Sequence, residues 1–167
     1  MALRHYIEVL PKHWELHYQR VGEIISRTVN LERIIDTMIA SYFCHDETKR
    51  NELLKLILCT ERITFESKRQ VLKWIFETYD KAIIEVHPTL FKDLQNIGEY
   101  RNVLAHNHLD TTQFITDNIA RTTKVNKYKN KKIEFEITDE VMKEKTELIT
   151  KCHHILQNWE GQAYLPI

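Results

Sequence analysis

The residues most suited to chemistry lie in one short stretch, Ile97-Gly98-Glu99-Tyr100-Arg101-Asn102-Val103-Leu104-Ala105-His106. On a helix, Asn102 and His106 are four residues apart and share a face, about 40° apart around the axis. The long side chain of Arg101 borders this face and can swing toward His106 across about 7.5 Å of helix rise. Two neighbouring cationic groups repel each other unless an anion lies between them. The stretch therefore predicts a site for a phosphate-like group.

Gly98, Asn102 and Ala105 give the same side of this helix a strip of small residues. A glycine inside a helix costs up to about 1 kcal/mol relative to alanine, so a close approach by another helix or by a ligand is expected at Gly98. A purely structural interpretation of the motif is also open. A histidine near a helix C-terminus interacts favourably with the helix dipole, even where it has no catalytic role.

The helices that must position this stretch are predicted from hydrophobic periodicity. Apolar residues at three- and four-residue steps predict a first helix that begins near Pro11 and ends near Phe43, and a second over 47–59. A third is expected from Thr64 to about Val86, a fourth from Pro88 to about 107, and the last after Thr138. Asp46, Thr64 and Thr138 are the expected N-caps.

A strand pattern interrupts the helical one before the last helix. Ile133, Phe135 and Ile137 alternate with two glutamates, which is the period of a strand, so 119–137 is predicted to be a β-hairpin with its turn near 127–130. The predicted fold class is all-α: an up-and-down helical bundle of four to five helices, with a small β-hairpin insertion before the last helix. We expect a single domain over residues 1–167.

Composition narrows the function classes only a little. The chain has 167 residues, with 3 Gly, 3 Pro and a formal net charge of +0, so any contact with nucleic acid must use local patches. The cysteines Cys44, Cys59 and Cys152 form no CxxC pair, which favours free thiols in a reducing compartment. Neither a signal pattern nor an apolar run of membrane-spanning length is evident, so a cytoplasmic protein without membrane contact is expected.

Through Arg101, Asn102 and His106, the chain resembles the HEPN family of all-α ribonucleases. HEPN domains carry an Arg, then four to six residues, then a His, and a polar residue, often Asn, follows the Arg. Arg101, Asn102 and His106 fall on those positions, late in a helix. The resemblance covers about 14–107 and the final helix, and the hairpin at 119–137 looks like a variable insertion. It implies an endoribonuclease of the toxin–antitoxin or phage-defence type.

The implied reaction is cleavage of RNA without a metal or other cofactor. The RNA 2′-hydroxyl attacks the adjacent phosphorus, which leaves a 2′,3′-cyclic phosphate and a 5′-hydroxyl. Histidine suits both proton transfers, because its ordinary pKa is about 6.5. Arg101 would stabilise the charge of the transition state, and Asn102 would orient His106 or hold a phosphate oxygen.

The resemblance also implies a homodimer, in which two copies of the Arg101–His106 motif face each other across the two-fold axis. The strip of small residues is the expected contact. In members paired with nucleotidyltransferase antitoxins, a tyrosine stands two residues after the histidine, whereas His108 stands there in this chain. Control by tyrosine adenylylation is therefore not expected, although another antitoxin protein remains open. His108 is a candidate second proton carrier or phosphate ligand.

Other residues have both a functional and an ordinary interpretation. Glu32 and Asp36 are candidates to orient Arg101, or are simply exposed. His13 and His17 have a metal-like spacing, but no third ligand is evident and no metal is expected. The most basic stretch predicts either an RNA-binding surface or a solvated hairpin; its residues are Arg121, Lys124, Lys127, Tyr128, Lys129, Lys131 and Lys132. The alternative function is a catalytically inactive HEPN domain that binds RNA, a nucleotide or a protein.

Overall fold

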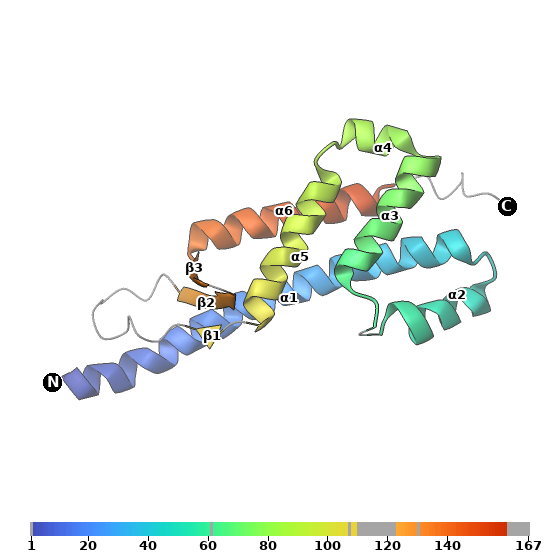
Figure 1. Cartoon of the computed structure of the whole chain (residues 1–167). Helices are drawn as coiled ribbons and strands as arrows, with labels where there is room; N and C mark the ends of the chain where they lie inside the picture. Colours follow the sequence, from blue (N-terminus) through green and yellow to red (C-terminus); the bar gives the residue numbers. More distant parts are fainter. Residues whose placement is uncertain (1, 61, 107, 110–122, 130, 160–167) are drawn as a thin grey trace. The chain divides into compact units, whose positions relative to one another are not determined.

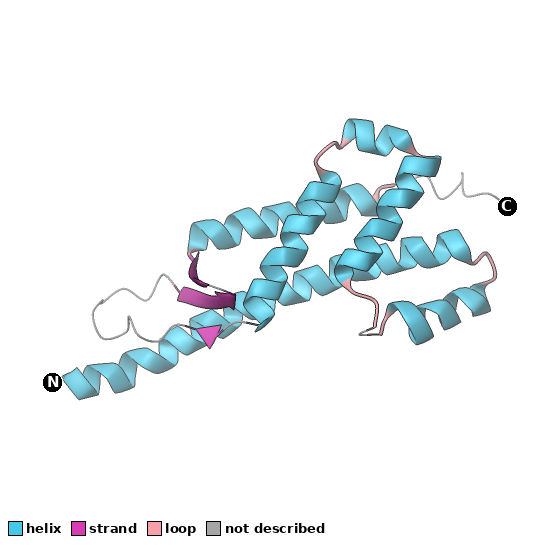
Figure 2. Ribbon diagram, viewed as in Figure 1, coloured by secondary structure: helices cyan, strands magenta, loops and turns pink. Residues whose placement is uncertain are grey.

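A computed structural model describes residues 2–60, 62–106, 108–109, 123–129 and 131–159, with side chains in 14–60, 62–106 and 137–159 (Figure 1). The described chain is mostly helical, as the sequence predicts (Figure 2). Its helices are α1 (Ala2–Phe43), α2 (Glu47–Leu53), the π-helix η1 (Leu54–Leu58), α3 (Phe65–Tyr79), α4 (Lys81–Val86), α5 (Leu90–His106) and α6 (Asp139–Gln157). No helix of this described part is long and apolar enough to cross a membrane.

The three predicted N-caps are confirmed. The backbone N–H of Lys49 donates to Asp46 Oδ1 at 2.9 Å, at the start of α2. The N–H of Ser67 donates to Thr64 Oγ1 at 3.1 Å, at the start of α3. The N–H of Val141 donates to the hydroxyl of Thr138 at 3.2 Å, at the start of α6. Each side chain satisfies a backbone donor that the first turn of a helix leaves without a partner.

Several helix boundaries differ from the prediction. Helix α1 begins at Ala2. The prediction placed its start near Pro11, because the periodic apolar stripe that indicated this helix begins only at Trp14. The predicted second helix continues from Leu54 as a π-helix. The predicted third helix is broken at Asp80, whose backbone adopts φ −147° and ψ 71°. The side chain of Asp80 accepts a hydrogen bond from Trp159 Nε1 at 2.6 Å, a long-range contact that local periodicity does not reveal.

The strands form an antiparallel sheet in the order β1–β2–β3, made of β1 (His108–Leu109), β2 (Thr123–Lys129) and β3 (Lys131–Ile137). Strands β2 and β3 fall within the predicted 119–137 range, and their register pairs Val125 with Phe135. The predicted turn near 127–130 is placed too early, because β2 continues to Lys129. The two-residue β1 was not predicted, since such a short strand has no period to detect.

The chain divides into two compact units, the first of residues 1–27 and 99–147 and the second of 28–98 and 148–167. In the first unit, the buried apolar side chains include Ile24, Val103, Leu104, Ile137 and Met142. In the second, they include Leu31, Ile35, Leu72, Ile75, Phe76, Leu90 and Leu94. The ring of Phe76 lies 5.9 Å from that of Phe91 and 4.9 Å from that of Trp159, between centroids. Burial of these apolar surfaces is the main stabilising contribution in each unit.

Candidate functional site

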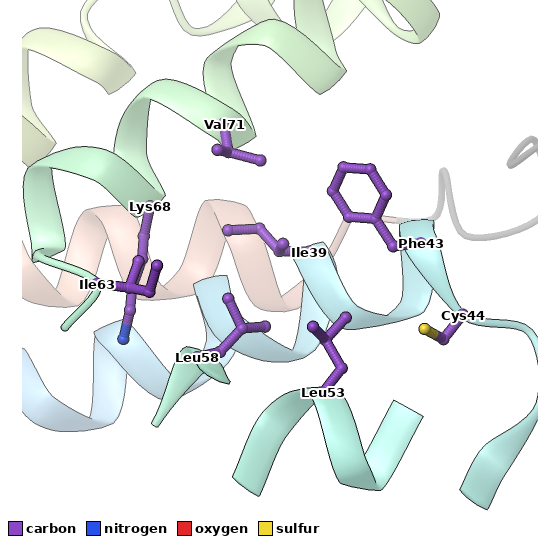
Figure 3. A pocket seen from close by; sticks show the side chains of 8 residues that line it. All are labelled: Ile39, Phe43, Cys44, Leu53, Leu58, Ile63, Lys68 and Val71. Carbon is purple, nitrogen blue, oxygen red and sulfur yellow. The ribbon is translucent and has the colours of Figure 1, made fainter. Parts of the chain in front are cut away.

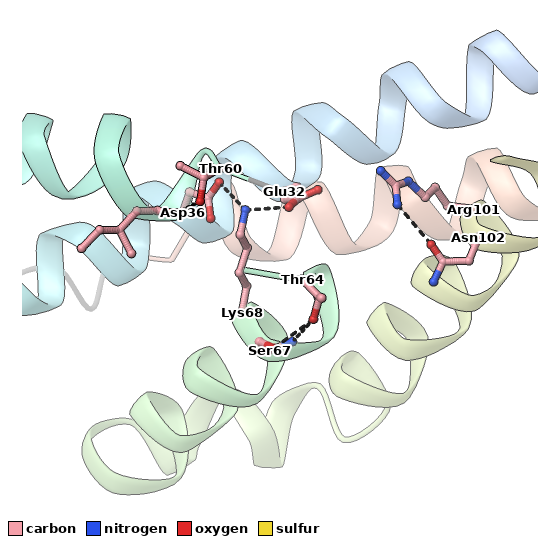
Figure 4. Close-up of polar contacts among 9 residues, drawn as sticks. Glu32, Asp36, Thr60, Thr64, Ser67, Lys68, Arg101 and Asn102 are labelled. Carbon is pink, nitrogen blue, oxygen red and sulfur yellow. Dashed lines mark hydrogen bonds and ion pairs between the residues drawn. The ribbon is translucent and has the colours of Figure 1, made fainter. Parts of the chain in front are cut away.

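Arg101 and Asn102 are joined by a hydrogen bond near the C-terminal end of α5. Arg101 Nη1 donates to Asn102 Oδ1 at 3.1 Å (Figure 4). The Arg101 side chain is half-buried, and that of Asn102 is exposed. Asn102 was expected to orient His106 or to hold a phosphate oxygen; in the structure its amide oxygen accepts from the guanidinium of Arg101. The amide NH₂ of Asn102 remains as a hydrogen-bond donor.

His106 is the last residue of α5, and its side chain is exposed. Among the described residues, no carboxylate forms an ion pair with Arg101, and the imidazole of His106 forms no hydrogen bond. A guanidinium without a carboxylate partner retains its charge for an incoming anion. This helix end therefore offers a cation, an amide donor and an imidazole within two turns of one helix.

The sequence predicts a close approach at Gly98, and the structure shows one: the neighbouring group is Phe65 of the same chain. Gly98 is buried, and a Cβ atom added there would lie 2.8 Å from Phe65 Cδ1 and 3.1 Å from Phe65 Cε1. Real Cβ atoms essentially never come so close to another heavy atom. Gly98 is thus explained by its packing against Phe65 of α3. The exposed remainder of the small-residue strip is Asn102 and Ala105.

Tyr100 is a polar residue that sequence reasoning did not single out. Its hydroxyl oxygen is buried and has no hydrogen-bond partner, and burial raises the pKa of Tyr100 to about 12. Lys145 Nζ of α6 lies 5.6 Å from the centre of the Tyr100 ring, a cation–π contact. Tyr100 therefore anchors the backbone directly before Arg101 against α6. Only its place beside the motif could have drawn attention to it.

His17 and Arg20 form a buried polar group on α1, in the same unit as the motif. His17 is only 6% exposed and its Nδ1 has no partner. Burial, and secondly the charge of Arg20, lower the pKa of His17, so this imidazole is neutral at pH 7. Arg20 donates to the carbonyl oxygen of Ile137 at 2.6 Å and pairs with Asp139. In the part of the chain that the structure describes, no three His, Cys, Asp or Glu residues gather as metal ligands.

Glu32 and Asp36 do not have the expected role of orienting Arg101. Lys68 Nζ of α3 donates to Glu32 Oε1 at 2.6 Å and to Asp36 Oδ2 at 2.9 Å (Figure 4). Lys68 is 2% exposed and Asp36 is 3% exposed, so this is a buried ion pair inside the second unit. Because a buried cation requires compensating charge, the two carboxylates are explained by Lys68.

The basic hairpin is described by its backbone alone. Strand β2 contains Lys124, Lys127, Tyr128 and Lys129, and β3 contains Lys131 and Lys132. The register pairs Tyr128 with Lys132 and Lys129 with Lys131. His108 lies in β1, paired with Asn126 of β2, while Arg121 lies outside the described residues. Strand β1 begins two residues after His106 and pairs with β2, which carries part of the basic stretch.

A scan against models of protein families, a search of characterised proteins and a search of solved structures find no match to this chain.

Proposed function

We propose that this protein is a metal-independent endoribonuclease of the HEPN type. In this proposal the helices form a HEPN-like bundle, and the β2–β3 hairpin is an insertion before the last helix. The observation that carries the proposal is the end of α5, where Arg101 is fixed by Asn102 and has no carboxylate partner among the described residues, while His106 is exposed. A buried or ion-paired Arg101 would be unsuitable for binding a phosphodiester.

The proposed reaction uses a nucleophile that belongs to the substrate. The ribose 2′-oxygen forms a bond to phosphorus, the bond from phosphorus to the 5′-oxygen breaks, and the products are a 2′,3′-cyclic phosphate and a 5′-hydroxyl. The 2′-oxygen loses a proton and the 5′-oxygen gains one, for which His106 is the proton carrier. Arg101 stabilises the negative charge that accumulates on the phosphoryl oxygens, and the Asn102 amide donates to one of them.

One motif provides one clear histidine, whereas the reaction needs a base and an acid. We propose that two copies of the chain form a homodimer with the Arg101–His106 motifs facing each other, which supplies two imidazoles to one phosphodiester. His108, in β1 beside the motif, is the candidate for a second proton carrier or phosphate ligand within one copy.

We assign RNA binding to the basic hairpin, because it follows the motif closely and joins it through β1. Lysines attract the phosphate backbone, and Tyr128 offers a ring on which an unpaired base can stack. The residues concerned are Arg121, Lys124, Lys127, Tyr128, Lys129, Lys131 and Lys132. A role in toxin–antitoxin systems or phage defence in the cytoplasm, restrained by an antitoxin protein, completes the proposal.

The test is RNA cleavage by purified protein in excess EDTA. We expect wild-type protein to cleave RNA, to leave 2′,3′-cyclic phosphate ends and to leave DNA of the same sequence intact. The variants His106→Ala and Arg101→Ala are expected to lose at least 100-fold in rate, because each removes a group that acts in the transition state.

Matched controls separate the motif from general loss of charge. His154 is exposed in the last turn of α6, as His106 is in that of α5, and Arg33 is exposed on α1. His154→Ala and Arg33→Ala should cleave like wild type. Cleavage that survives in His106→Ala, or that EDTA abolishes, contradicts the proposed chemistry. RNA binding without cleavage in wild-type protein would favour the alternative, an inactive HEPN domain that serves as a binding module.

A further inference from the structure

A cavity of about 370 Å³ lies within the second unit, between the C-terminal part of α1, the α2–η1 segment and α3 (Figure 3). Helix α1 contributes Ile39 and Phe43 to its wall, η1 contributes Leu58 and α3 contributes Val71. The surface that these side chains present to the cavity is apolar. Ile39 and Leu58 are buried, whereas Phe43 is 57% exposed and stands at the edge.

The charge beside the cavity is already neutralised. Lys68 is the charged residue of the wall, and its ammonium group is bonded to Glu32 and Asp36, at 2.6 and 2.9 Å. The aliphatic stem of Lys68 therefore faces the cavity, while its Nζ is turned to the carboxylates (Figures 3 and 4). Two carboxylates around one ammonium leave no positive charge to attract an anion. This arrangement disfavours phosphates and carboxylates and favours a neutral ligand.

The size of the cavity fits a small molecule. A dry apolar cavity of about 150 Å³ holds benzene, and ligand pockets start at about 300 Å³. A volume of about 370 Å³ therefore accommodates a two-ring aromatic molecule or an aliphatic chain of similar size.

The backbone beside the cavity is also unusual. The N–H of Cys59 donates to the carbonyl oxygen of Leu54 at 2.8 Å, five residues back, as in a π-helix. Such π-turns are rare and recur at functional sites. Here the π-helix brings Leu58 to the cavity wall.

We propose that this cavity is a binding site for a neutral, apolar small molecule of about the size of naphthalene. The cavity and the Arg101–His106 motif belong to different units of the chain, so the proposal does not depend on the proposed cleavage of RNA.

The experiment uses the full chain and prodan, a neutral naphthalene dye whose emission shifts to the blue in apolar surroundings. We expect saturable binding with one dye per chain. The variant Val71→Phe places a ring in the cavity and should weaken binding at least tenfold. The control Val86→Phe changes an exposed valine of α4 outside the cavity and should bind as wild type does. Circular dichroism of each variant reports whether the helices are retained.

A second measurement keeps the test independent of Val71→Phe. Cys44 belongs to the cavity wall, Cys59 is exposed, and Cys152 is buried with its pKa raised to about 12, so it is inert to thiol reagents. In a Cys59→Ser protein, N-ethylmaleimide should react with Cys44, and saturating prodan should slow this reaction at least fivefold. Unsaturable dye binding, equal binding by Val71→Phe, or labelling of Cys44 that prodan does not slow would overturn the proposal.

Discussion

At the scale of single residues, Lys68 is the least exposed of the described lysines and arginines. It is almost fully buried, and its ammonium group satisfies two carboxylates that come from one face of α1. Hydrogen bonds to Glu32 and Asp36 raise the pKa of Lys68 against the opposing effect of burial. The opposite balance holds for Asp36, where burial outweighs Lys68 and raises the pKa of the carboxyl. The charges of Lys68 and Asp36 therefore depend on each other.

Removal of the cation should expose this dependence. Lys68→Met keeps the aliphatic stem but leaves two carboxylates without a counter-charge, so we expect the free energy of unfolding to fall by about 3–5 kcal/mol. Lys73→Met is the matched control, because Lys73 forms an exposed pair with Glu77 at 3.4 Å on the same helix. That control should change stability by about 0.5 kcal/mol or less. Urea denaturation measures both, and similar losses in the two variants would contradict the buried-pair account.

The motif and the cluster of Lys68, Glu32 and Asp36 show how much of a polar site a sequence can predict. The motif of Arg101, Asn102 and His106 is local, so the sequence alone is enough to propose it, and its role stays a prediction. Glu32 and Asp36 were also noticed, as two carboxylates on one helix face, but their partner lies 36 and 32 residues away along the chain. Nothing in the local pattern distinguishes Lys68 from the exposed lysines around it. The sequence therefore predicted the carboxylates and missed the contact that explains them.

At the scale of elements, the helix starts with a side-chain cap were predictable, whereas the break at Asp80 and the π-helix were not. Asp46, Thr64 and Thr138 cap their helices through contacts three residues along the chain, which is information the sequence contains. The break between α3 and α4 instead coincides with the hydrogen bond from Trp159 to Asp80, across 79 residues. The π-helix likewise has no sequence signature in Leu54–Leu58.

The two described helical glycines offer a direct test of element packing. Gly22 of α1 has no atom within 4 Å of an added Cβ, whereas an added Cβ at Gly98 of α5 would lie 2.8 Å from the Phe65 ring. Gly22→Ala should raise the free energy of unfolding by about 0.5–1 kcal/mol, because it removes only the backbone-entropy cost of glycine. Gly98→Ala should lower it by about 1–3 kcal/mol, because the Phe65 ring must shift.

The double variant Gly98→Ala with Phe65→Leu tests the cause. If the Phe65 ring is responsible, the pair should be less destabilised than the sum of the two single variants, a coupling that a double-mutant cycle measures by thermal or urea unfolding. Additive losses, or a stabilising Gly98→Ala, would show that α5 and α3 are not in the described close contact.

At the scale of the whole molecule, a net charge of +0 provides no general attraction to RNA, so the proposed RNA binding would have to come from the motif and the hairpin. The described part of one chain offers one exposed imidazole at the motif, and two proton transfers are needed. The proposed homodimer would supply the second imidazole, and His108 of the same copy is the alternative source.

Subunit mixing distinguishes these two sources. Wild-type chains exchanged with an equal amount of His106→Ala should form about one quarter wild-type dimers, so activity should fall to about one quarter of that of wild type alone at the same total concentration. Independent sites would retain about one half. Mixing with His154→Ala, whose exposed histidine is on α6, should leave full activity. Sizing chromatography gives the oligomeric state of the same samples. A strict monomer, or activity that remains at one half, would mean that each copy supplies its own acid and base, in which case His108 becomes the residue to replace.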